Sequence, residues 1–467
     1  MIAPIDETGR SPEKTAGAPA REDSRGTHGP VLAIPEHRAL LEALVPLPAP
    51  LGLPLEECRG LIAASDARAL VPVPAFTNSA MDGFALRSAD LVPNASGGLD
   101  LPVAGDAPAG DERANVCAPG TAWRIMTGAP VPEGADTVVK VEWTDHEAGV
   151  CAAPARVRLH RLPSPGANVR LRGEGVGVGD LVVPAGSPLT AGALAAAASV
   201  GLDSLLVHPR PRVLVVATGA ELVAPGDPLG PGRIHDSNGV MLAALAAEAG
   251  AEVVGTLVSD DDPDAFLDLL ADAPGADLVL TAGGVSQGAF EVVRLAVGKN
   301  GRFHHVAQQP GGPQGLGTLP IGPARAPTPA ICLPGNPVSV FVSFHVYVAG
   351  LLARLAGRAS LVAGSSAPTL LPGVSAASWR SPAGKTQFVP VRPVPAGDED
   401  RDAPSPAASG APTPIRVEPV HLLGSGSHLT GALALAEFLA VVGPERDAVA
   451  PGEPVELLPI LGRGRRA

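Results

Sequence analysis

Polar, glycine-bearing loops follow three short apolar runs in the second half of the chain. The runs have the character of β-strands and cover residues 213–217, 277–281 and 330–333. The loops in this half are ATGAEL (217–222), DSN (236–238), DDDP (260–263), TAGGVS (281–286) and LPGNPVS (333–339). Open α/β sheets bind ligands at the carboxyl ends of their strands, because helix N-termini and free backbone N–H groups converge there. These loops therefore predict a site that handles phosphates or nucleotides.

A second group of chemically useful side chains lies upstream of these loops. Asp82 lies in the small-residue segment NSAMDGFA (78–85), where the backbone can approach a ligand closely. Thr127 adds a hydroxyl, and the closely spaced Arg170 and Arg172 could clamp a phosphate. A structural alternative stays open for three of them: Asp82 could form a turn, and both arginines could lie exposed on a strand.

The charge balance and the cysteine content exclude several classes of protein. The 34 Lys and Arg against 47 Asp and Glu give a net charge of −13, which argues against non-specific binding to nucleic acid or to anionic membranes. The 4 cysteines lie far apart without a CxxC pair, so we expect a reducing cytoplasm and neither disulfides nor a thiolate zinc site. No signal-peptide pattern is present, and the longest apolar stretch, 338–352, is interrupted by His345 and too short to span a bilayer. We expect a soluble protein.

Four segments of the chain have the apolar periodicity of helices. They are 39–45, 55–64, 189–201 and 238–250. Thr190 suits an N-cap and Gly201 a stop for the third of these helices. Ser237 or Asn238 suits the cap of the fourth, which we expect to end at Gly250.

The predicted fold is multidomain, with α/β and β parts. Strand and helix patterns alternate from 212 to 357, which is typical of a parallel, helix-covered sheet. Short alternating strands before and after this segment predict a β-rich insertion and a small β-barrel or sandwich. The predicted parts are a disordered tail (1–30), an N-terminal helical linker domain (31–70 with 169–208), the β-rich inserted domain (71–168), the α/β domain (209–358) and a C-terminal β-barrel (362–462) with a flexible insert (394–414).

Eight segments together resemble the molybdopterin molybdenumtransferases, the family that includes the C-terminal enzyme domain of gephyrin. They are NSAMDGFA (78–85), TGAPVPEGAD (127–136), NVRLRGE (168–174), PAGSPLT (184–190), ATGAEL (217–222), DSN (236–238), AGGVSQG (282–288) and LPGNPVS (333–339). They occur in the order of the family, and the resemblance runs from about residue 35 to 460. NSAMDG followed by TGAPVP and LPGNPVS is highly specific as a set.

The resemblance implies an activity and a molybdopterin-binding-like central domain. Members of the family take molybdopterin activated as an adenylate, cleave its phosphoanhydride and insert molybdate, which gives molybdenum cofactor and AMP. The resemblance also implies a divalent metal such as Mg²⁺ and a homodimer with the site between subunits. Asp82, Thr127 and Glu221 are then the expected catalytic residues. Asp82, Glu221 and Asp261 are the expected carboxylate ligands of the metal, although the acidic run around Asp261 also suits a helix start.

Hydroxyls, backbone N–H groups and cations are the expected holders of phosphate and molybdate oxygens. The expected substrate-binding residues are Ser79, Arg170, Arg172, Gly283, Gly284, Ser286, Pro334, Asn336, Pro337, Ser339, Lys385 and Ser427. The expected partners are a second copy of the chain and the molybdoenzymes that accept the cofactor, with no nucleic acid and no membrane.

Several charged positions of the family pattern differ in this chain. The usual TGDEL has Ala220 for its first acid, and the GGVSxGDxD segment has Ala289 and Glu291 in place of its carboxylates. The Pro-Gly-Lys-Pro loop, which follows another lysine, reads QPGGPQ (309–314) here, so both ammonium groups are missing. Losing a charged partner at a buried anion site costs a few kcal/mol. Because the turn residues are kept, we expect the loop to hold an oxyanion with amide and backbone donors.

Two alternatives to this enzyme stay open from the sequence. A non-catalytic or specialised paralogue would bind molybdopterin, molybdate or a partner enzyme, and the missing lysines and acids motivate it. A scaffold that engages other proteins through its C-terminal barrel is the third possibility, without a peptide-binding signature in its favour. The retained Asp82, Thr127, Glu221 and PGNP loop favour the enzyme over both.

Overall fold

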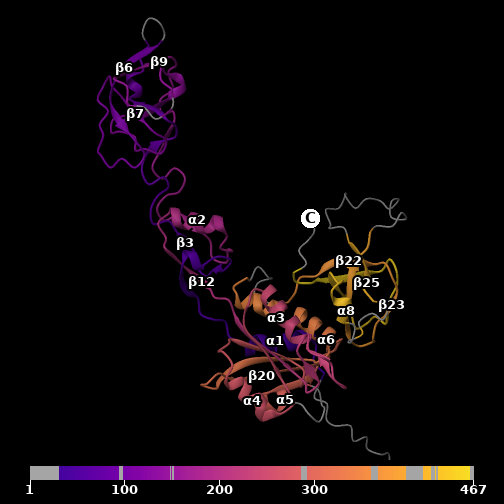
Figure 1. Cartoon of the computed structure of the whole chain (residues 1–467). Helices are drawn as coiled ribbons and strands as arrows, with labels where there is room; N and C mark the ends of the chain where they lie inside the picture. Colours follow the sequence, from indigo (N-terminus) through magenta and orange to yellow (C-terminus); the bar gives the residue numbers. More distant parts are fainter. Residues whose placement is uncertain are drawn as a thin grey trace, which may run out of the picture.

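A stalk separates the β-rich part of the chain from the rest of the molecule (Figure 1). The computed structural model describes residues 31–93, 98–147, 149, 152–285, 292–358, 367–395, 414–421, 426 and 430–462. The predicted tail (1–30) and most of the predicted insert (394–414) lie outside these residues. The β-rich part lies at one end of the stalk, and the α/β domain and the barrel lie together at the other.

A six-stranded sheet forms the centre of the α/β domain, in the order β16-β13-β17-β21-β20-β18. The strands are β16 (Glu252–Ser259), β13 (Arg212–Thr218), β17 (Leu278–Ala282), β21 (Ala326–Leu333), β20 (Pro313–Ile321) and β18 (Arg302–His305). The first four are parallel, and β20 and β18 extend the sheet in antiparallel pairings. The predicted central sheet is confirmed, with an antiparallel edge that the sequence pattern did not reveal.

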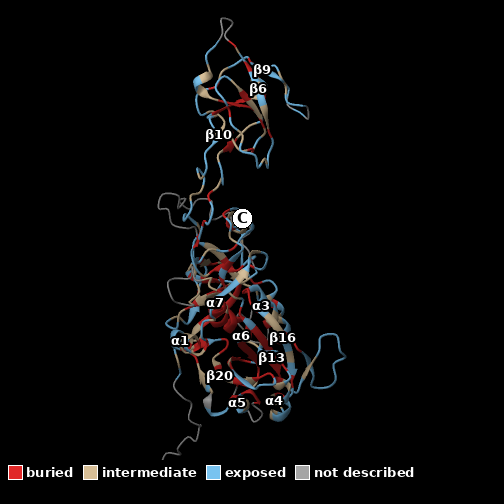
Figure 2. Ribbon diagram, turned by 90° about the vertical axis from the view of Figure 1, so that its left-hand side faces the viewer, coloured by how far each residue is buried: buried red, intermediate tan, exposed pale blue. Residues whose placement is uncertain are grey.

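Helices cover both faces of this sheet. α1 (Ile34–Leu44), α3 (Asn238–Glu248), α6 (Pro337–Ser343) and α7 (Ala349–Leu355) pack on one face, and α4 (Pro263–Ala271) and α5 (Val292–Val297) on the other. Along β13, Val213 and Val215 belong to the first core and Leu214 and Val216 to the second. Because both faces of the strand are buried, its sequence is continuously apolar. Figure 2 shows this burial concentrated around β13 and α6.

α6, the π-helical turn η5 (Phe344–Val348) and α7 run on as one apolar helix, Pro337–Leu355. Within the described ranges it is the one helix long and apolar enough to cross a membrane, so the expectation that this stretch is too short was wrong. However, 78% of its apolar window is buried inside the protein, and Phe344 and Leu352 are part of the α/β core. The helix therefore serves as the central packing element of that core.

The stalk is a small domain built from two separate stretches of chain. β1 (Leu51–Pro54), β12 (Ser204–His208) and β2 (Ile62–Ala63) form one sheet, and β3 (Ala67–Arg68) pairs with β11 (Leu181–Val183). α2 (Ala191–Ser199) forms as predicted, with the Thr190 hydroxyl accepting the N–H of Ala193 at 3.3 Å. The predicted helix at 55–64 is wrong. Only a 3₁₀ turn, η1 (Leu55–Glu57), forms there, because Gly60 turns the chain at φ +76° and β2 pairs with β12.

The β-rich domain contains a five-stranded sheet in the order β8-β5-β7-β6-β9. Its strands are β8 (Thr137–Lys140), β5 (Gly83–Leu86), β7 (Ala122–Ile125), β6 (Leu99–Ala107) and β9 (Arg156–Leu159). The 3₁₀ turns η2 (Ser88–Asp90) and η3 (Val141–Trp143) follow β5 and β8. β4 (Asn78–Ser79) pairs with β10 (Val169–Arg170) where the chain enters and leaves this domain.

Five strands close into a C-terminal barrel, which confirms that part of the predicted fold. They are β24 (Thr386–Pro393), β25 (Ile415–Pro419), β22 (Leu371–Ser375), β28 (Pro454–Pro459) and β26 (Phe438–Val442), and β26 pairs back with β24. β19 (Gln308–Gln309) comes from the α/β domain and pairs in parallel with β24. The smaller elements of this half are β14 (Leu222–Val223), β15 (Ile234–His235), η4 (Gly298–Asn300), β23 (Trp379–Arg380), α8 (Thr430–Leu433) and β27 (Ala448–Val449).

Candidate functional site

The loops at the carboxyl edge of the α/β sheet lie side by side. Gly219 donates its N–H to Ser259 O at 3.0 Å, and Gly283 donates its N–H to Leu333 O at 3.1 Å. These bonds link the end of β13 to β16 and the end of β17 to β21, and β13 and β17 are themselves neighbours. Loops from four separate stretches of the chain therefore form one surface, at the edge where α/β sheets bind ligands.

Glycines let backbones approach one another closely at this edge. Gly283 has φ +100°, and a Cβ on it would come within 2.6 Å of Thr218 O. Gly284 has φ +64°, and a Cβ there would lie 2.9 Å from Val293 Cγ2. The two glycines predicted to bind substrate thus bring main chain, rather than side chains, to the edge.

The DSN segment joins the same edge through α3. Asn238 Nδ2 donates to Gly335 O at 2.7 Å, while Asn238 Oδ1 is buried without a partner among the described residues. Asp236 is 4% exposed, and its Oδ1 accepts the N–H of Gly239 at 2.9 Å. This carboxylate, rather than the predicted side chain of Ser237 or Asn238, holds the first turn of the helix.

Two of the carboxylates predicted as metal ligands lie at this edge. Asp261 Oδ2 accepts the N–H of Ala220 at 3.2 Å, which places it against the segment that carries Glu221. The Glu221 carboxylate folds over Gly219, where an added Cβ would be 2.7 Å from Glu221 Oε1. Asp262, rather than Asp261, is the residue of the acidic run that caps α4. In the described part of the chain, no three His, Cys, Asp or Glu side chains gather as a group that could hold a metal.

Asp82 lies in the β-rich domain, directly before β5. Thr127 donates to Asp82 Oδ1 twice, from its N–H at 2.6 Å and from its hydroxyl at 2.7 Å. These bonds hold the pKa of Asp82 below its ordinary value, so the carboxylate is ionised at neutral pH. Asp82 is exposed and lines a cavity of about 290 Å³, which Arg124 and His146 also line. Two of the predicted catalytic residues are therefore in direct contact.

The other predicted residues near Asp82 are largely engaged within the protein. Ser79 is fully buried, and its hydroxyl donates to Met81 O at 2.6 Å. Arg172 Nε donates to Ala75 O at 3.1 Å. Arg170 is exposed on β10. Ser79 and Arg172 thus shape the turns around Asp82, and Arg170 is the better placed of the two arginines to meet a ligand.

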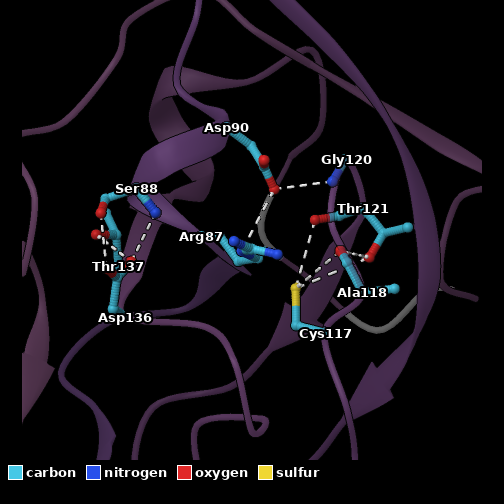
Figure 3. A network of polar contacts seen from close by, with 9 residues as sticks. All are labelled: Arg87, Ser88, Asp90, Cys117, Ala118, Gly120, Thr121, Asp136 and Thr137. Carbon is cyan, nitrogen blue, oxygen red and sulfur yellow. Dashed lines mark hydrogen bonds and ion pairs between the residues drawn. The ribbon is translucent and has the colours of Figure 1, made fainter.

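A separate polar network holds η2 to two loops of the same domain (Figure 3). Asp136 accepts both the N–H and the hydroxyl of Ser88, each at 2.6 Å. Asp90 Oδ2 accepts the N–H of Gly120 at 2.8 Å. Because Asp136 ends the TGAPVPEGAD segment, the last acid of that segment has a structural role here.

The QPGGPQ loop (309–314) lies against the start of the long apolar helix. A Cβ on Gly311 would come 2.8 Å from Ser343 Oγ and 3.3 Å from Ser339 O. Ser339 and Pro334 are buried, Pro337 opens α6, and the exposed Asn336 precedes it without a side-chain capping bond. The loop that lacks the expected lysines therefore meets the LPGNPVS segment, as a shared site requires.

Lys385 comes from the barrel and lies next to the same loop. Thr386 donates its N–H to Ala307 O at 2.9 Å, and β24 then pairs with β19. Lys385 directly precedes this pairing, and its side chain is exposed. It is a cation beside the loop whose own lysines are missing.

The predicted residues that the structure describes fall into two groups. Asp82, Thr127 and their neighbours lie in the β-rich domain, whereas Glu221, Asp261 and the glycine loops lie at the edge of the α/β sheet. The stalk holds these groups apart within one chain (Figure 1). Ser286 and Ser427 lie outside the described residues.

Sequence reasoning missed several buried polar residues of this region. The sequence predicts Asp236 only as part of a loop, and its pattern does not single out Gln308 or Tyr347. Tyr347 is the only tyrosine of the chain and lies in the long apolar helix Pro337–Leu355, which was the available signal. Because buried hydroxyls need partners, a lone tyrosine there indicates a polar contact.

Known families and proteins match both parts of the chain that carry these residues. Residues 32–201 match the family model of the MoeA N-terminal region (domains I and II), and residues 214–354 match that of a probable molybdopterin-binding domain. The chain is 42% identical over 366 residues to molybdopterin molybdenumtransferase 2 of Mycobacterium tuberculosis. The aligned region covers 76% of this chain and 86% of that relative. It is 33% identical over 450 residues to molybdopterin molybdenumtransferase 1 of the same organism, which covers 91% and 98%.

A solved structure shares the whole architecture. The MoeA molybdopterin biosynthesis protein of Pyrococcus horikoshii superposes with a TM-score of 0.71 at 26% sequence identity. The match covers 93% of this chain and 100% of that one. The similarity therefore extends over the β-rich domain, the stalk, the α/β domain and the barrel.

Proposed function

Because the chain belongs to the molybdopterin molybdenumtransferases, enzymes of molybdenum cofactor biosynthesis, we propose that it inserts molybdate into adenylylated molybdopterin with release of AMP. The observation that carries this proposal is the pair of hydrogen bonds from Thr127 to Asp82. They join the two motif segments NSAMDG and TGAPVP into one ionised, exposed carboxylate. Such a group is suited to binding a metal ion or to moving a proton at a phosphoanhydride.

The working site combines the two groups of residues in a homodimer. Within one chain the stalk separates Asp82 from Glu221 (Figure 1). In a symmetric dimer, the β-rich domain of one subunit can face the sheet edge of its partner, and the same pairing then occurs twice. In this arrangement, residues of both domains can act on one substrate.

Mg²⁺ fits the carboxylates at the sheet edge. The donors of Glu221 and Asp261 are hard oxygens next to one loop. Protein Mg²⁺ sites commonly use one or two carboxylates and complete the shell with water and substrate phosphates, so a third protein ligand from the same chain is not needed. Asp82 of the second subunit is the candidate for a further ligand. A bound Mg²⁺ supplies Lewis-acid polarisation of the phosphoanhydride oxygens.

The other predicted residues have different roles in this proposal. The backbone of Gly284, with Ser339 and Asn336, binds oxyanions at the strand ends. Gly283, whose N–H is bonded to Leu333 O, keeps this turn tight, and Ser286 remains a predicted contact. Arg170 and Lys385 supply positive charge, and Pro334 and Pro337 fix the turn between β21 and α6. Ser79 and Arg172 shape the turns around Asp82, and Ser427 remains a predicted contact from the barrel. We place the reaction in the cytoplasm, with acceptor molybdoenzymes as the recipients of the product.

The experiment is a reconstitution with adenylylated molybdopterin, Mg²⁺ and molybdate. AMP release and the activation of a cofactor-free molybdoenzyme are both measured. Asp82→Asn should abolish both signals, whereas Asp136→Asn, which removes a structural carboxylate of the same domain, should lower stability and keep turnover. Substrate binding without AMP release by the wild-type protein would instead support the binding-only paralogue.

A further inference from the structure

An exposed loop leaves the edge of the α/β sheet just after Glu221 and returns to the same place. The strands at its two ends, β14 and β15, pair with each other, and residues 224–235 are all exposed. Ile234 donates its N–H to Glu221 O at 2.9 Å. Asp236 donates its N–H to Val223 O at 2.9 Å. The main chain therefore holds the returning end of the loop directly beside one of the proposed metal ligands.

Arg233 is the last residue of the loop before β15, and its side chain turns back toward the sheet edge. Its guanidinium donates from Nη1 to the carbonyl oxygen of Ala220. Its own N–H donates to Gly230 O at 3.2 Å, which closes a turn inside the loop. Ala220 in turn donates its N–H to Asp261 Oδ2 at 3.2 Å. Ala220 thus bonds to an arginine through its carbonyl and to an aspartate through its N–H.

Most of the donors of this guanidinium are left for a ligand. An arginine has five N–H donors in a planar fork, and the contact with Ala220 O uses one of them. Among the described residues, no carboxylate forms an ion pair with Arg233, whereas Arg124 of the Asp82 cavity is paired with Asp106. Arg233 is also exposed. It therefore presents an unpaired cation to solvent at the strand ends.

The neighbouring side chains at this edge are mostly acidic. Glu221 and Asp261 lie against the 219–221 segment, and Asp260 and Asp262 flank Asp261. A phosphoanhydride is itself negatively charged, so these carboxylates repel it unless positive charge lies among them. Mg²⁺ supplies part of that charge in the proposed function. A guanidinium supplies more, and its fork matches two phosphate oxygens at once.

The side chain of Arg233 is not needed to hold the loop in place. The ends of the loop are joined by the main-chain bonds from Ile234 and Asp236, and His235 Nε2 lies 2.9 Å from Asp227 O within the loop. Removing the charge of Arg233 leaves all of these contacts. An unpaired cation that the fold does not require, next to two proposed metal ligands, indicates a role in binding an anion.

We propose that Arg233 binds the phosphate oxygens of the adenylylated substrate at the carboxyl edge of the sheet. The inference rests on the proposed function and adds a substrate-binding residue that the sequence did not single out. Arg233 holds the phosphoanhydride beside Glu221 and Asp261, so that the exposed loop becomes one wall of the site. The ligand class is a phosphate ester or anhydride, and the nucleoside is not part of this contact.

The test measures the binding of AMP, adenosine and inorganic pyrophosphate to the full-length protein by titration calorimetry. Arg233→Gln removes the charge and keeps a side-chain N–H that can donate to Ala220 O. It should raise the dissociation constants of AMP and pyrophosphate about ten- to a hundredfold, the usual value of a charged hydrogen bond. Adenosine, which has no phosphate, should bind both proteins alike. Arg233→Lys keeps the charge without the fork and should lie between them.

A second arm repeats the titrations in EDTA. Because the proposed contact is direct, the difference between Arg233→Gln and the wild-type protein should persist without a divalent metal. A difference that vanishes in EDTA would show that Arg233 acts only through the metal site, and this would overturn the proposal.

Arg325→Gln is the matched control. Arg325 is also an exposed loop arginine that donates from Nη1 to a backbone carbonyl, Leu267 O, at 3.4 Å. It precedes β21 and therefore lies at the opposite edge of the sheet. Its substitution should leave all three dissociation constants unchanged, and the melting temperatures of the two glutamine variants should be similar.

Three further results would overturn the inference. They are wild-type affinity for AMP in Arg233→Gln, an equal loss of affinity for adenosine, and a wild-type protein that binds neither AMP nor pyrophosphate. AMP release from adenylylated molybdopterin by the wild-type protein is measured in parallel. Turnover together with unchanged affinities in Arg233→Gln refutes the role of Arg233 alone, whereas absence of turnover refutes the proposed function.

Discussion

Thr127 binds Asp82 through two hydrogen bonds that end on the same carboxylate oxygen, Oδ1. Neither bond involves Oδ2, which is the oxygen left to meet a ligand. The contact bridges 45 positions of sequence and joins the loop before β5 to the loop after β7. Because it stabilises the ionised form of Asp82, it has a direct consequence for the pH dependence of the enzyme.

Thr127→Ala should move the acid limb of the pH profile of kcat/KM to higher pH. The pKa of Asp82 is lowered first by the Thr127 N–H and second by its hydroxyl, so losing the hydroxyl returns part of the shift. A lowered pKa keeps the carboxylate ionised, and its contribution present, until the pH falls through the folded-state value. In the variant, the contribution of the ionised Asp82 carboxylate should therefore be lost at higher pH. Thr127→Ser is the control that keeps the bond, and an unmoved limb in Thr127→Ala would refute the assignment.

Mixing two inactive variants should restore activity if the site is shared between subunits. Asp82→Asn and Glu221→Gln each remove one half of every site. In a dimer that contains one of each, one site loses both residues and the other keeps both. Random re-association makes about half of the dimers mixed, and each mixed dimer has one intact site of two. The mixture should therefore recover about a quarter of the wild-type rate of AMP release. Mixtures that stay inactive although the subunits exchange would place both residues in one chain's own site.

Asp261→Asn should raise the Mg²⁺ concentration needed for half-maximal activity. Asp261 lies against the 219–221 segment, so its charge is available at the sheet edge. Asp262→Asn is the neighbouring control. Asp262 accepts the N–H groups of Asp264 and Ala265, each at 2.9 Å. The amide oxygen of Asn can accept the same bonds, so Asp262→Asn should cost little stability and leave the Mg²⁺ requirement unchanged. An identical Mg²⁺ requirement in Asp261→Asn and the wild-type protein would remove Asp261 from the proposed ligands.

Gly283→Ala should destabilise the protein by roughly 1–3 kcal/mol and abolish most of its activity. The added Cβ would meet Thr218 O at 2.6 Å, so the ends of β13 and β17 must separate. Gly226→Ala is matched in backbone conformation, with φ +97°, but has no atom within 4 Å of the added Cβ. It should cost less stability, measured by thermal or urea unfolding. Equal costs would show that backbone strain, rather than the close approach, sets the requirement for glycine.

Much of the fold could be predicted because the pattern of apolar residues is strong where strands are buried on both faces. β13 and β17 are continuous apolar runs, and Thr190 caps α2 as its position suggests. The helix expected at 55–64 failed because its apolar positions serve a strand pairing with β12, which lies about 140 residues away in the chain. Local periodicity contains no information on such a distant partner.

The candidate site could be predicted at the level of segments and less well at the level of roles. Asp82 and Thr127 were expected to act together, and they touch. Ser79 and Arg172 were expected to bind substrate, yet their polar atoms contact the protein's own backbone. The amide of Gln314 was expected among donors to an oxyanion and instead holds Gly311 O. Which side of a turn a side chain faces depends on tertiary packing, and residue type alone does not specify it.

The pairing of β19 with β24 has a consequence for dividing the protein into independent folding units. A cut in the chain between the α/β domain and the barrel would leave the polypeptide of the α/β domain intact. It would also strip β19 of its hydrogen-bonding neighbour and leave an open strand edge beside the QPGGPQ loop. Unpaired edges recruit strands from other chains, so the isolated α/β domain should be prone to aggregate. The barrel thus covers the strand edge beside the loop, although the barrel lies outside the sheet that carries the strand-end loops.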